Sequence, residues 1–79
     1  MQASTVLKKI ADSITPYIGA LMARSSIELH CKRLGISGVT INRDQLDQLL
    51  RQLGLGLVIF IGRDKTDAVL REIRGSVES

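Results

Sequence analysis

The sequence predicts a mainly α-helical domain, a small bundle of four to five short helices that spans residues 1–79. Two observations predict this class. Apolar residues recur at spacings of three and four along most of the chain, which is the period of an amphipathic helix. Residues that start and stop helices separate these stretches. Hydrophobic residues make up 44% of the chain, which excludes a disordered protein.

The first predicted helix is short and ends at a proline. Val6, Ile10 and Ile14 share one helical face. The residue before a proline disfavours the helical conformation, so we expect this helix to end at Thr15. Thr15 is also a good N-cap, and Pro16 suits the first position of a new helix. We therefore expect two helices that meet in a sharp corner at these two residues.

The second predicted helix runs from residue 16 to about residue 34. Lys32 and Arg33 stand in its last turn, where positive charge interacts favourably with the helix dipole. Gly35 follows, with Ile36 after it, and this pair is typical of a left-handed C-terminal cap. The sequence therefore predicts the end of this helix from two independent signals.

The third predicted helix spans residues 43–53. Asn42 is a favourable N-cap, and Gln45 stands three residues later, which completes a capping box. Ile41 and Leu46 are spaced as the matching hydrophobic staple. This is the most specific local signal in the chain.

The apolar run 55–61 leaves two interpretations open. Residues 57–61 have the length and β-branched content of a short buried strand, but they also fit a buried helix. As a strand, they would pair with residues 39–41 around the third helix or pair across a dimer. Because a two-stranded sheet has little independent stability, we slightly favour the helix.

The last predicted helix covers about residues 64–74. Asp64 is its expected N-cap, and Gly75 is its expected stop. Ala68, Val69 and Ile73 are its expected buried residues.

Two segments, residues 17–23 and 55–61, are apolar on every side. Such segments need more cover than a short chain readily offers, although a central core helix would also explain the first. A single cysteine and a single histidine provide neither an internal disulfide nor a zinc site. We therefore expect a homo-oligomer, with a dimer favoured. The candidate interface residues are Tyr17, Ile18, Leu21, Met22, Leu57, Ile59 and Phe60.

The sequence indicates no catalytic, cofactor-binding or metal-binding residues. His30 and Cys31 are neighbours on a helix and point about 100° apart, so they do not form a reactive pair. Cys31 shares the apolar stripe of Ile27 and is expected to be a packed thiol. No apolar run is long enough to span a bilayer and no secretory signal is seen, so we expect a cytoplasmic protein without a membrane partner.

One stretch carries a pattern found in DNA-binding proteins. Residues 27–46 contain Cys31, then Gly35-Ile36-Ser37, then Thr40-Ile41 and Arg43, and they resemble the helix-turn-helix of bacterial regulators. The resemblance covers about 20 of the 79 residues. It implies a dimeric DNA-binding regulator that uses residues 26–46. The implied DNA contacts are Ser37, Thr40, Asn42 and Arg43.

Charge patterning weakens the DNA-binding interpretation. The net charge of +3 is compatible with nucleic acid, but several basic residues follow an acidic residue at i, i+4, as Arg51 follows Asp47. This spacing is typical of solvated helices with local ion pairs. The favoured function is therefore a small oligomeric interaction or regulatory module without catalytic activity. DNA binding is the alternative.

Overall fold

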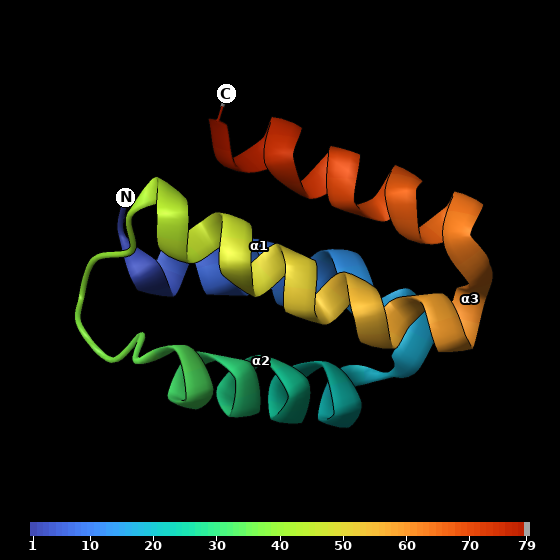
Figure 1. The fold of residues 1–79 in the computed structure, drawn as a ribbon, viewed down its shortest axis with the longest axis horizontal. Helices are drawn as coiled ribbons and strands as arrows, with labels where there is room; N and C mark the ends of the chain where they lie inside the picture. Colours follow the sequence, from blue (N-terminus) through green and yellow to red (C-terminus); the bar gives the residue numbers. More distant parts are fainter. Residues whose placement is uncertain (79) are drawn as a thin grey trace.

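The computed structural model describes residues 1–78 and contains three helices, α1 (Ala3–Ile18), α2 (Ala20–Leu34) and α3 (Arg43–Glu78) (Figure 1). The helix α3 bends at Gly62, whose φ of 82° and ψ of 169° are not helical. We call residues 43–61 the first limb and residues 63–78 the second limb. The mainly helical class is confirmed, whereas the expectation of four to five separate helices is wrong.

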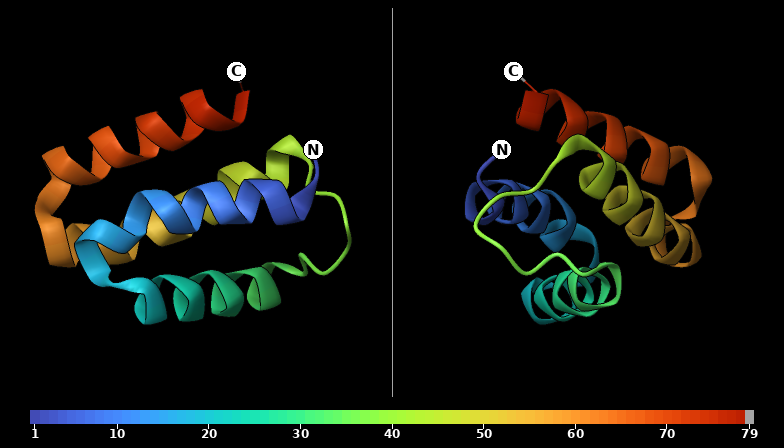
Figure 2. Two further views of the ribbon diagram at one scale, coloured as in Figure 1. Left: turned by 180° about the vertical axis from the view of Figure 1, so that it is seen from behind. Right: turned by 60° about the vertical axis from the view of Figure 1, so that its left-hand side comes forward.

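The three helices pack against one another around one core. Figures 1 and 2 show α2 beside α1, and the second limb of α3 folded back along the first. The core side chains are the apolar stripes that the helical period predicts. Those that are fully buried include Ile10, Ile14, Ile41, Leu46, Leu49, Leu50, Val69 and Ile73.

The corner between the first two helices lies at Gly19 and not at Pro16. The helix α1 continues through Pro16 to Ile18. The Thr15 hydroxyl donates to the carbonyl of Ala11 at 2.6 Å, so it does not cap a following helix. Proline has no backbone N–H, so α1 lacks the hydrogen bond from residue 16 to the carbonyl of Asp12 but still continues for two more residues. The chain turns at Gly19, where φ is 85° and ψ is 157°, a region that is essentially restricted to glycine.

The end of α2 is confirmed as predicted. Gly35 is left-handed, with φ 73° and ψ 24°. Its N–H donates to the carbonyl of Lys32 at 3.4 Å, and the N–H of Ile36 donates to the carbonyl of Cys31 at 2.8 Å. These two bonds form a Schellman motif, which satisfies carbonyls at the end of the helix.

The capping box at the start of α3 is also confirmed. The Gln45 N–H donates to Asn42 Oδ1 at 2.7 Å, and the Asn42 N–H donates to Gln45 Oε1 at 2.9 Å. Ile41 and Leu46, the expected staple, are both buried. The helix does not stop at residue 53, however, because it continues through two glycines to the bend at Gly62.

Residues 57–61 are helical, so the strand interpretation is wrong. Residues 39–41 pair instead with the beginning of the chain. The Ala3 N–H donates to the Val39 carbonyl and the Ile41 N–H to the Met1 carbonyl, both at 2.9 Å. Gln2 and Thr40 form an isolated antiparallel bridge, and residues 1–78 contain no longer strand. Residues 57–61 satisfy their backbone groups within α3 and need no strand partner.

The second limb begins directly after Gly62 and continues past Gly75, which was expected to stop it. Val69 and Ile73 are buried as predicted, whereas Ala68 is exposed. The two limbs approach closely at Gly54, where a Cβ atom would lie 3.0 Å from Cδ1 of Leu70. None of the helices within residues 1–78 is both long and apolar enough to cross a membrane.

Candidate interaction surface

The two apolar segments meet at one end of the molecule. The α1–α2 corner at Gly19 and the α3 bend at Gly62 lie at this end, as Figures 1 and 2 show from opposite sides. We call the exposed large side chains of these two segments the apolar end. They are Tyr17, Leu21, Met22, Leu55, Val58, Ile59 and Phe60.

The predicted interface residues fall into three groups. Leu21, Ile59 and Phe60 are 79%, 83% and 60% exposed. Tyr17 and Met22 are about half exposed, and their remaining surface rests on the protein. In the third group, Ile18 packs partly against the core and Leu57 is buried in it.

Leu57 is therefore wrong as an interface residue. It follows Leu53 by one helical turn, so it lies on the face that packs against α1 and α2. Leu55 and Val58 are exposed and lie in the predicted segment 55–61, although they are not among the candidate interface residues. The spacing of Leu55 and Ile59 at i, i+4 signals a second apolar face, but only once the segment is known to be helical.

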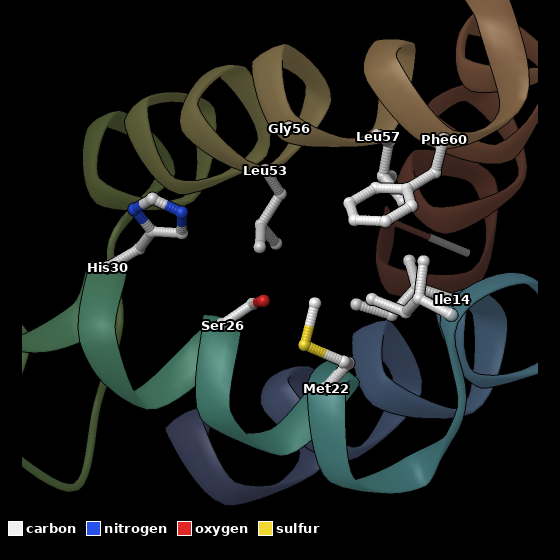
Figure 3. A pocket seen from close by; sticks show the side chains of 9 residues that line it. Ile14, Met22, Ser26, His30, Leu53, Gly56, Leu57 and Phe60 are labelled. Carbon is white, nitrogen blue, oxygen red and sulfur yellow. The ribbon is translucent and has the colours of Figure 1, made fainter.

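A shallow pocket of about 50 Å³ joins the two segments (Figure 3). The helix α2 contributes Met22, Ser26 and His30 to its wall, and the first limb of α3 contributes Gly56 and Phe60. Nothing lies within 4 Å of the position that a Cβ of Gly56 would occupy, so the pocket is open to solvent on this side. The remaining lining residues are Ile14, Ile18, Leu53 and Leu57.

His30 brings a titratable group to this mostly apolar pocket. Its Nδ1 atom is buried and has no hydrogen-bond partner within the protein. Burial lowers the pKa of His30 below its usual value of 6.5, and the nearby Arg33 lowers that pKa further. The neutral imidazole is therefore favoured, and a neutral pocket wall suits an apolar contact better than a charged one.

Cys31 is a packed thiol, as expected. It is 7% exposed and belongs to the core with Ile27. Burial raises the pKa of the Cys31 thiol, which disfavours the reactive thiolate. Residues 1–78 hold no group of three or more His, Cys, Asp or Glu side chains arranged to bind a metal ion.

Asp47 forms a structural ion pair across the two limbs of α3. Its Oδ1 atom lies 2.6 Å from Nη1 of Arg74. This hydrogen bond lowers the pKa of the Asp47 carboxyl, with smaller contributions from the charges of Arg74, Arg43 and Arg51. The pair connects residues 27 positions apart and so bridges the two limbs at the surface.

The residues implied as DNA contacts lie at the other end of the molecule. Ser37, Thr40, Asn42 and Arg43 are all exposed in or next to the connection between α2 and α3. That connection spans residues 35–42, whereas the turn of a helix-turn-helix has about three or four residues. The Asn42 side chain is committed to the capping box.

Comparisons with protein-family models, with curated proteins and with solved structures find no match to this chain. The function proposed next therefore rests on the chain's own surface. The strongest feature of that surface is the apolar end, because its two segments were singled out separately in the sequence and lie together in space.

Proposed function

We propose that this protein is a small, non-catalytic interaction module that self-associates through its apolar end. The observation that carries the proposal is the exposure of Leu21, Ile59 and Phe60 on neighbouring segments. Several large apolar side chains exposed near one another on a small protein are typical of an interface. The partner to which we commit is a second copy of this chain.

This choice depends on the kind of surface that the chain exposes and not on its total area. The accessible surface of the 8.7-kDa chain is 5149 Å². A compact monomer of this mass exposes about 4700 Å². The surface of the chain is therefore close to that of a compact monomer, and large exposed hydrophobic side chains gather at its apolar end.

The size of the apolar end matches the requirement of a dimer. A fully exposed side chain offers about 100 Å² when aliphatic and about 200 Å² when aromatic, so the apolar end presents on the order of 500 Å² of apolar surface. A standard interface buries about 800 Å² on each partner, of which a little more than half is apolar. Two copies would reach that value only by covering side chains on both sides of the first limb, because Phe60 faces the pocket whereas Leu55 and Val58 face the second limb.

Sedimentation equilibrium tests this proposal with a matched pair of variants. Ile59 and Val39 are both 83% exposed, but Val39 lies in the connection at the opposite end. We expect the natural chain to dimerise at micromolar concentration. Ile59→Lys raises the dimer dissociation constant by about tenfold or more, whereas Val39→Lys leaves it unchanged. A natural chain that stays monomeric, or equal effects of both variants, contradicts the proposal.

DNA binding is the second candidate, and the exposure of Ser37, Thr40 and Arg43 favours it. Fluorescence anisotropy with duplex DNA at increasing salt tests it. A DNA-binding protein loses affinity steeply as salt rises, and Arg43→Ala reduces that slope. If the interaction-module proposal is right, we expect no such salt-dependent affinity.

A further inference from the structure

We propose that α3 opens at Gly62 into one continuous helix, and that two copies of the chain exchange their second limbs. The proposal rests on the self-association proposed above and specifies how the second copy docks. In the exchanged dimer, residues 63–78 of each chain take the place of the same residues in the other. The second copy is thus both the partner and the source of the docked segment.

The bend at Gly62 makes this opening accessible. One residue joins the two limbs, and its φ of 82° and ψ of 169° lie in a region essentially restricted to glycine. Nothing lies within 4 Å of the position that a Cβ of Gly62 would occupy, so the hinge residue itself is not packed against other atoms on that side. Glycine also adopts helical angles, and a one-residue hinge between packed helices favours exchange over a loose loop.

Helical phase gives the second observation. If the helix continues through Gly62 at about 100° per residue, Leu55 and Ile73 point in the same direction because they are five turns apart. Val58 and Ile59 fall on the same face as Thr66 and Val69. Side chains that are exposed in the first limb therefore join the buried stripe of the second limb. The full stripe contains Leu55, Val58, Ile59, Gly62, Thr66, Val69, Leu70 and Ile73.

The opposite face of the first limb already packs on α1 and α2. Leu46, Leu53 and Leu57 lie about half a turn away from the stripe and are buried in the core. Opening at Gly62 therefore leaves this packing intact. Opening changes only two things. The second limb packs on the other chain, and the side chains of the stripe near Gly62 gain new neighbours.

The contacts of the second limb do not oppose exchange, and the stripe beside the hinge favours it. Inside the second copy, residues 63–78 make the contacts that they make in their own chain, including Leu70 on Gly54 and Arg74 on Asp47. These contributions therefore cancel between the two forms. The stripes of the two copies also meet beside the hinge, where Leu55 and Ile59, 64% and 83% exposed in the bent chain, become covered.

A hinge variant measures the equilibrium between the bent and open forms. Gly62→Ala strains the bent form but suits a helix, so we expect the dimer dissociation constant to fall by about tenfold or more. Gly75→Ala is the matched control, because Gly75 lies in the second limb with open space around it and has no positive φ. We expect this control to leave the dissociation constant unchanged. Equal effects of the two variants overturn the proposal.

A charge-exchange experiment identifies which chain supplies the second limb. Asp47→Arg and Arg74→Asp each place like charges together within one chain, because the natural pair is only 2.6 Å apart. In an exchanged heterodimer of the two variants, both pairs become attractive again. We expect native mass spectrometry of the equilibrated mixture to show more heterodimer than random mixing gives. The doubly substituted chain, Asp47→Arg with Arg74→Asp, is the control and restores the pair within each copy.

The outcomes separate the two proposals. A dimeric natural chain whose charge variants mix at random overturns the exchange and leaves the self-association through the apolar end standing. A monomeric natural chain overturns both proposals, because the exchange rests on the self-association.

Discussion

The two ends of the molecule are built from different chemistry. At one end, the connection 35–42 meets the beginning of the chain, and its backbone groups bond to Met1 and Ala3. A Schellman motif and a capping box flank it, and Ile36 and Ile41 are buried beneath it. At the other end, two glycines turn the chain, and the side chains beside them are large, apolar and exposed.

This difference shows at which end of the molecule large apolar side chains gather in contact with water. Polar caps and backbone pairing satisfy the backbone groups of the first end. The second end is closed geometrically, by Gly19 and Gly62, but its apolar surface stays in contact with water. Most of the exposed large apolar residues are thus concentrated at the end that holds Gly19 and Gly62. They do not indicate loose packing throughout the molecule.

We expect the largest change in stability when a buried side chain is lost at the end that contains the connection 35–42. Ile41 is fully buried, so Ile41→Ala removes packing and leaves a cavity, at a cost of about 2–4 kcal/mol in the free energy of unfolding. Ile59→Ala, at the apolar end, should change the stability of the monomer by less than about 0.5 kcal/mol. Urea unfolding under dilute conditions measures both. Similar losses would show that the apolar end supports the fold itself.

A smaller effect is expected from the capping box. Asn42→Ala removes the side-chain oxygen that accepts from the Gln45 N–H, which should cost about 1 kcal/mol. Gln48→Ala, an exposed change further along the same helix, is the control and should be nearly neutral. Thermal unfolding followed by circular dichroism compares the two variants. A neutral Asn42→Ala would mean that α3 does not depend on its cap.

The smallest effect concerns His30 at the pocket. Its pKa is lowered in the folded protein, so the unfolded chain binds the proton more readily. The contribution of neutral His30 to the free energy of unfolding should therefore be fully present above pH 6.5 and decline as the pH falls below that value. His30→Gln should remove this decline in urea unfolding between pH 7.5 and pH 5. The window stays above the acid range, in which stability from the lowered pKa of Asp47 is lost.

Local signals made part of the fold predictable. The Asn42 and Gln45 pair and the Gly35 cap act through bonds between near neighbours, so their residue types define the geometry. The corner was misplaced because Thr15 and Pro16 suit a helix start as well as a helix end. Gly19 decides the turn through its backbone angles, which the sequence permits but does not require.

The candidate surface was predictable only in part. That residues 17–23 and 55–61 need cover follows from composition, but that they share one end depends on how α1, α2 and α3 pack. One reason explains why Leu57 is buried although it is a candidate interface residue, and why Leu55 is exposed although it is not one. A run that is apolar at nearly every position has no periodicity, so only tertiary packing decides which side chains face the core.

The burial of Cys31 makes its thiol a natural reporter of local opening of the fold. It is the single cysteine in the sequence, and the core shields its sulfur from reagents in solution. An alkylating reagent therefore labels it only when the α2 face transiently separates from the rest of the bundle. The rate of labelling measures how often that separation occurs, without any added probe.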